Sequence, residues 1–79
     1  MTDQLHFLDT SGLQCPLPVL RAKKTLRDLA PGARLRVIAT DPASVIDFRH
    51  FCNVTGYLLE KALENDGKFE YIIVKNVTG

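Results

Sequence analysis

The sequence predicts an α+β fold, namely a two-layer α/β sandwich with the element order β-α-β-α-β-β, in which two helices cover one face of a mixed four-stranded sheet. Three observations lead to this prediction. The 79 residues suffice for one domain with one small hydrophobic core. Segments with strand-like and helical spacing alternate along the chain. The turn-forming residues 65–67 separate the last two segments. We therefore expect residues 1–79 to form a single domain.

The first half of the chain predicts a strand, a helix and a second strand. Leu5 to Leu8 is a short apolar run that ends in the turn formers at residues 9–12. From Pro16 to Ala30, apolar residues recur at helical spacing and charged residues fill the other positions. Pro31 and Gly32 end this amphipathic helix. Arg34 to Thr40 is rich in β-branched and apolar residues and predicts the second strand.

A second helix is expected after residue 41. Asp41 is a favourable N-cap residue, and Pro42 suits the first helical position because proline has no N–H to leave unpaired there. The apolar face of this helix includes Val45, Phe48 and Cys52. Gly56 predicts its end, since glycine readily adopts the left-handed conformation of a helix C-cap.

The last segments predict a β-hairpin. Tyr57 to Glu64 fits a helix or a strand equally well by its spacing, whereas Lys68 to Lys75 alternates as a strand should. A hairpin across Asn65-Asp66-Gly67 requires a strand on both sides, so we predict a strand for Tyr57 to Glu64. The sheet face away from the helices should be more polar, with an apolar patch formed by Ile38, Ile72 and Val74.

Composition argues against several classes of protein. The formal net charge of +1 gives no strong field for nucleic acid or a membrane surface. Residues 1–8 lack the basic start and apolar run of a signal peptide, and no apolar stretch approaches the roughly 20 residues that a membrane helix needs. Two cysteines are too few for a secreted disulfide scaffold. We therefore expect a cytoplasmic protein in a reducing compartment, without contact to membranes.

Cys15 is the candidate catalytic residue. It directly precedes Pro16, which we expect at the first position of the helix. A helix N-terminus presents unpaired N–H groups and the positive end of the helix dipole, and both favour a thiolate. The alternative from spacing alone is a free cysteine in a capping turn that does no chemistry.

The pattern Asp9-x-x-Gly12-Leu13-x-Cys15-Pro16-x-Pro18 resembles the TusA/SirA family of small sulfur-carrier proteins. The resemblance covers nearly the whole chain, because the two helix starts and the final hairpin also fit. It implies that Cys15 accepts sulfane sulfur as a persulfide. It also implies that the surrounding motif shapes the loop and the helix start, and this motif comprises Gly12, Leu13, Pro16 and Pro18.

The resemblance further implies partners but no cofactor. The sulfur donor would be a cysteine desulfurase or another donor protein, and an acceptor protein would receive the sulfur. In this family the sulfur serves thiolation of a tRNA wobble uridine, molybdenum-cofactor maturation or sulfur oxidation. A carrier of this kind hands sulfur to proteins, so no direct contact with nucleic acid is expected.

Two other functions remain open at this point. The protein could be a regulatory or binding module in which Cys15 is incidental. It could also be a thiol redox protein that pairs Cys15 with Cys52. Against the second alternative, Pro18 stands where a Cys-x-x-Cys motif would have its second cysteine, and Cys52 lies on an apolar stripe that predicts a core position.

Several charged residues have both a structural and a functional interpretation. Arg21, Lys24 and Arg27 form either a solvated helix face or a docking surface for an acidic partner. Asp41 is either a simple N-cap or part of the partner surface. His6 and His50 do not match the spacing of a metal site, so no metal is expected.

Overall fold

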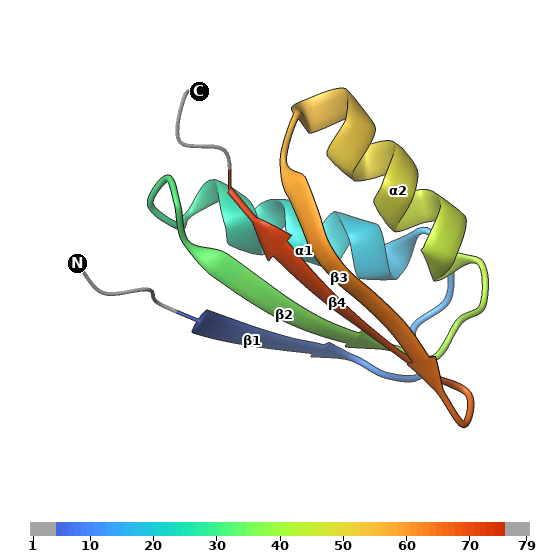
Figure 1. Cartoon of the computed structure of the whole chain (residues 1–79). Coiled ribbons are helices and arrows are strands. Elements are labelled where there is room, and N and C mark those ends of the chain that lie inside the picture. Colours follow the sequence, from blue (N-terminus) through green and yellow to red (C-terminus); the bar gives the residue numbers. More distant parts are fainter. Residues whose placement is uncertain (1–4, 76–79) are drawn as a thin grey trace.

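The computed structural model describes residues 5–75, so residues 1–4 of the amino end considered above lie outside it. Within this range the elements follow the predicted order β-α-β-α-β-β (Figure 1). Their bounds are Leu5–Thr10 for β1, Leu17–Arg27 for α1, Arg34–Ala39 for β2, Ser44–Thr55 for α2, Leu58–Asn65 for β3 and Lys68–Val74 for β4. The α+β class and the strand prediction for the segment before the last turn are both confirmed.

The four strands form one mixed sheet in the order β1-β2-β4-β3. β1 runs parallel to β2, with Leu5 opposite Arg34 and Thr10 opposite Ala39. β4 pairs antiparallel with both β2 and β3. Because β1 and β2 are parallel, the loops that follow them leave the sheet at the same end. The starts of α1 and α2 therefore lie near each other (Figure 1).

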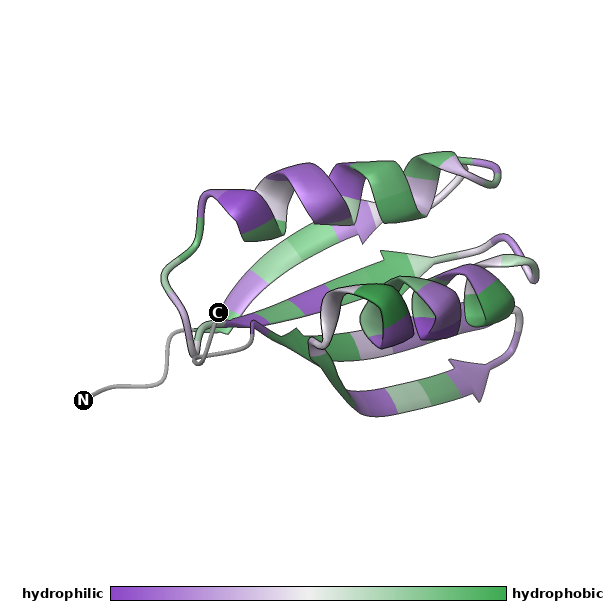
Figure 2. Cartoon of the chain, turned by 90° about the horizontal axis from the view of Figure 1, so that it is seen from above, coloured by the Kyte–Doolittle hydropathy of each residue, from purple (hydrophilic) through white to green (hydrophobic). Residues whose placement is uncertain are grey.

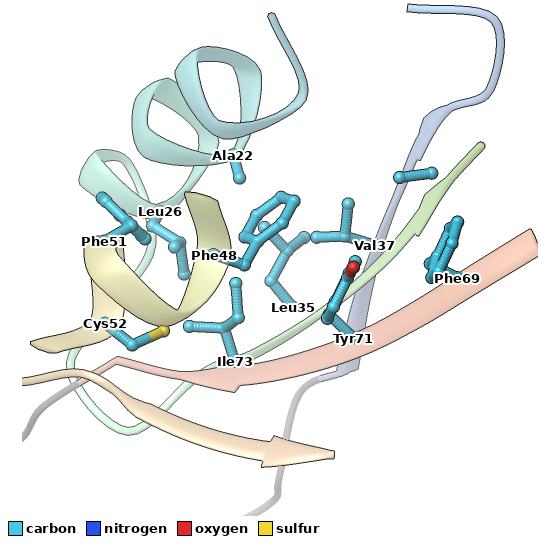
Figure 3. Close-up of a cluster of buried hydrophobic side chains, with 11 residues drawn as sticks. Ala22, Leu26, Leu35, Val37, Phe48, Phe51, Cys52, Phe69, Tyr71 and Ile73 are labelled. Carbon is cyan, nitrogen blue, oxygen red and sulfur yellow. The ribbon is translucent and has the colours of Figure 1, made fainter. Parts of the chain in front are cut away.

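Both helices cover the same face of the sheet, and the hydrophobic core lies between the two layers (Figure 3). Leu26 of α1, Phe48 of α2 and Leu35 of β2 are fully buried. The remaining core side chains are Ala22, Val37, Ala39, Phe51, Cys52, Phe69, Tyr71 and Ile73. Burial of one large apolar side chain stabilises the fold by roughly 1.5–3 kcal/mol, so this cluster fixes how the helices sit on the sheet.

The hydropathy of the helices follows this packing, with apolar and polar residues alternating along each ribbon (Figure 2). On the opposite face of the sheet, Arg36 pairs with Glu70 at 2.8 Å and lies over the Phe7 ring. Ile38, Ile72 and Val74 are partly buried on this face, where they pair with Glu70, Arg36 and Arg34 across the strands. Within residues 5–75 no helix has the length and apolar character needed to cross a bilayer.

The starts of both helices differ from the predictions. α1 begins at Leu17, so Pro16 is its N-cap residue and Pro18 its second helical residue. α2 begins at Ser44 with Ala43 as N-cap, so the prediction that Asp41 caps this helix was wrong. In both segments the proline lies in the turn that precedes the helix, one or two residues before the expected position. The predicted stop at Gly56 is confirmed, with φ of 80° in the left-handed region.

Candidate functional site

The candidate site lies at the end of the sheet where the loops after β1 and β2 meet. The loop after β1 begins with a tight turn, because the Leu13 N–H donates to the Thr10 carbonyl at 3.1 Å. Gly12 has φ of 81°, a conformation that glycine adopts without a steric penalty. Its N–H donates to the Thr40 hydroxyl oxygen at 2.9 Å. The motif glycine thus joins the two loops.

Asp41 provides the second connection between the loops. One carboxylate oxygen accepts a hydrogen bond from the Cys15 backbone N–H. The other oxygen accepts one from the Ala43 N–H at 3.0 Å. These hydrogen bonds, with that from Cys15 first, lower the pKa of the Asp41 carboxyl group below its usual value. Asp41 is therefore a clamp that holds Cys15 against the start of α2.

Cys15 itself is exposed and is joined to Pro16 by a cis peptide bond. The helix start offers its sulfur few N–H groups, because Pro16 and Pro18 have none and the Leu17 N–H donates to the Gln14 carbonyl at 2.8 Å. Instead the thiol donates a hydrogen bond to the carboxylate of Asp47 on α2.

This hydrogen bond shifts the pKa of the thiol in the direction opposite to the one that the sequence predicts. It raises the pKa of Cys15, and partial desolvation and the negative charges of Asp47 and Asp41 act in the same direction. The sequence predicts a thiolate favoured by the helix N-terminus, whereas the contact with Asp47 favours the protonated thiol in this structure. The stabilisation of a thiolate by a helix end is modest at an exposed site.

The packing of α2 on the sheet holds Asp47 in this position. Ser44, the first residue of α2, forms a buried hydrogen bond of 2.8 Å with the Tyr71 hydroxyl on β4. Phe48 stacks on the Tyr71 ring with 4.6 Å between ring centroids. Asp47 lies between these two anchors in the first turn of the helix. Asp47 was not among the predicted site residues, although an acidic residue in the first turn of the helix after a parallel strand points to this end of the sheet.

An apolar groove of about 390 Å³ runs between α1 and α2 from the Cys15 end of the fold. Pro16 and Asp47 line the groove next to Cys15. The exposed apolar side chains of Leu20 on α1 and of Ile46 and Val54 on α2 also line it. Its charged and titratable lining side chains are Asp47, Lys23 and His50.

The remaining predicted site residues differ in their distance from Cys15. Gly12, Leu13, Pro16, Pro18 and Asp41 all belong to the two loops and the helix start described above, and Pro18 is buried. Arg21, Lys24 and Arg27 are exposed along α1, at intervals of three residues. Since a helix rises about 1.5 Å per residue, these basic residues extend progressively away from Cys15.

Cys52 lies in the core, is 6% exposed and points toward Ile73 (Figure 3). It lies five positions after Asp47, so the two residues are about 7.5 Å apart along the α2 axis. The two residues also point to different sides of the helix, because Asp47 faces Cys15 and Cys52 faces the core. A disulfide between Cys15 and Cys52 would require α2 to leave the sheet. Among residues 5–75, no three His, Cys, Asp or Glu side chains gather as metal ligands would.

The fold and site define a class of small two-layer proteins that present one exposed cysteine before the first helix. A family model described as Sulfurtransferase TusA matches residues 6–75, and the chain belongs to this family. The sulfur carrier protein TusA of Allochromatium vinosum is 53% identical over 76 residues, covering 96% of this chain and 100% of that protein.

Other relatives agree with this family. TusA of Pseudomonas aeruginosa, also named a sulfur carrier protein, is 46% identical over 68 residues, which cover 86% of each chain. Among solved structures, a SirA-like protein from Desulfitobacterium hafniense superposes with a TM-score of 0.80 at 32% identity. The superposition covers 92% of this chain and 99% of that one.

Proposed function

We propose that the protein is a sulfur carrier that holds sulfane sulfur as a persulfide on Cys15. The single observation that carries this assignment to a residue is the position of Cys15, exposed on the loop that opens α1 and fixed by the Asp41 clamp. Cys52 is buried, so Cys15 is the cysteine that a protein partner can reach. Membership of the TusA family supports the sulfur-carrier role.

The carrier needs a donor and an acceptor protein. We infer that a cysteine desulfurase, or another protein with a cysteine persulfide, loads Cys15. An acceptor protein in tRNA thiolation, molybdenum-cofactor maturation or a related sulfur pathway then receives the sulfur. Two cysteines without a disulfide fit a reducing cytoplasm, where such donors operate. We infer that one domain performs the whole carrier function without a cofactor.

A loading assay tests this function. The protein is incubated with a cysteine desulfurase, pyridoxal phosphate and cysteine, and its intact mass is followed. The wild type should gain the mass of one sulfur atom, reductant should remove it, and Cys15→Ser should gain none. Equal loading of Cys15→Ser would refute Cys15 as the carrier residue. No loading of the wild type by desulfurases or by a persulfide donor would refute the carrier function.

We also infer that the basic residues of α1 form a docking surface for the donor. Arg21, Lys24 and Arg27 are exposed on α1, and Arg27 lines a surface pocket together with Lys23. In the loading assay, Arg21→Glu combined with Lys24→Glu should slow sulfur transfer while the circular dichroism spectrum stays the same. Loading at the wild-type rate would show that this surface does not dock the donor.

A further inference from the structure

The contact between Cys15 and Asp47 restrains the reacting sulfur atom. The sulfur donates a hydrogen bond to the Asp47 carboxylate, and only the protonated thiol can donate it. The contact therefore selects the form of Cys15 that is not nucleophilic, because thiolates rather than thiols attack sulfur. A carrier cysteine held as a thiol must break this hydrogen bond to Asp47 before it can accept sulfur.

The charges around the sulfur are mostly negative. Asp47 faces Cys15 from α2 and Asp41 from the loop before it, while Lys23 of α1 and His50 of α2 line the groove farther along. Within residues 5–75, neither carboxylate forms an ion pair with a basic side chain. Both carboxylates raise the pKa of the Cys15 thiol, and the Asp47 hydrogen bond is the largest cause. An approaching persulfide anion would also be repelled here.

We propose that Asp47 keeps Cys15 as an unreactive thiol in the free protein, and that a basic side chain of the sulfur donor releases it by pairing with Asp47. The proposal rests on the function of Cys15 given above. Asp47 is thus a catalytic residue that touches the reacting atom and also recognises the partner. Its carboxylate lines the open groove beside Pro16, where a side chain of a docked protein can reach it.

The loading step then balances without an oxidant or reductant. Pairing of Asp47 with the donor's cation frees the thiol, which gives its proton to water. The Cys15 thiolate attacks the terminal sulfur of the donor persulfide, so that a new S–S bond forms as the donor's S–S bond breaks. The donor cysteine leaves with the electron pair and takes up a proton. The transferred sulfur keeps its oxidation state.

Small disulfides of different charge test the proposal without any donor protein. Thiol–disulfide exchange at Cys15 is followed by intact mass at pH 7 and low salt, with cationic cystamine, neutral hydroxyethyl disulfide and anionic dithiodiglycolate. In Asp47→Asn, the rate with the neutral disulfide should rise severalfold because the thiolate is no longer disfavoured. The rate ratio of cystamine to the neutral disulfide should fall about threefold to fivefold, and that of dithiodiglycolate should rise.

Matched controls separate the effect of the Asp47 carboxylate from the effect of net charge and from background reaction. Asp28→Asn removes an equal charge at the far end of α1 and should leave both ratios unchanged. Cys15→Ser measures the background from Cys52. In the wild type, 1 M salt should weaken the preference for cystamine, which provides a measurement that needs no variant.

Two results would overturn the proposal. If the neutral disulfide reacts no faster with Asp47→Asn, the carboxylate does not restrain the thiol. If the cystamine ratio is the same in wild type and Asp47→Asn, a cation does not release it. Neither result depends on sulfur transfer, so failure here is distinct from failure of the loading assay.

Discussion

Cys52 packs between α2 and the sheet, whereas Cys15 is exposed in the loop before α1. Both thiols have raised pKa values, but for different reasons. Burial raises the pKa of Cys52 to about 11. For Cys15, which is exposed, the main cause is the hydrogen bond to Asp47.

The difference between these causes separates a structural cysteine from the proposed carrier cysteine. Desolvation of Cys52 persists as long as α2 stays on the sheet, so only unfolding can free this thiol. The hydrogen bond of Cys15 lies at the surface, so contact with a partner can remove it while the fold remains intact. A raised pKa marks an inert thiol in the first case and a thiol that can be switched on in the second.

The largest expected effect is the difference in alkylation rate between the two cysteines. Iodoacetamide at pH 8 should modify Cys15 at least about a thousandfold faster than Cys52, because Cys52 becomes accessible only when the core opens, at a cost of several kcal/mol. Intact mass spectrometry of wild type and Cys15→Ser measures the two rates. In concentrated guanidinium the rates should converge. Comparable rates in the folded protein would contradict the assignment of Cys52 to a closed core.

Substitution by serine should affect stability more at Cys52 than at Cys15, whereas alkylation is faster at Cys15. Cys52→Ser places a hydroxyl in the core and should reduce the free energy of unfolding by about 1–3 kcal/mol. Cys15→Ser should leave the urea midpoint unchanged, since the site is exposed and a serine hydroxyl can also donate to Asp47. Urea unfolding with an unchanged m-value measures both effects. A marked loss of stability in Cys15→Ser would mean that the loop supports the fold as well as the chemistry.

The sequence predicts the environment of Cys52 better than that of Cys15. The apolar stripe of α2 places Cys52 in the core because helical spacing alone determines which side chains share a face. The environment of Cys15 depends on how two separate loops meet. Asp41 and Asp47 lie 26 and 32 positions from Cys15 along the chain, and only the parallel pairing of β1 with β2 brings them together. A local pattern at the helix start therefore predicts the position of the thiol but not its charge environment.

The smallest effect concerns the Asp41 clamp, which has no counterpart at Cys52. Hydrogen bonds from the Cys15 and Ala43 amides lower the pKa of Asp41, so its carboxylate favours the native loop above the pKa of the unfolded chain. This contribution is lost as the pH falls through the folded-state pKa. The amide chemical shift of Cys15 in NMR spectra should therefore titrate with a midpoint below the ordinary value of 3.8.

In Asp41→Asn this acid transition of the Cys15 amide should disappear, whereas Asp28→Asn should retain it. The amide chemical shift of Cys52 should stay unchanged across the same pH range, because the clamp ties two surface loops and not the core. A midpoint at or above 3.8 would show that the carboxylate does not hold the Cys15 amide in solution. If acid instead exposed Cys52 along with the Cys15 loop, the two thiol environments would form one cooperative unit, and the surface switch could not operate independently of the fold.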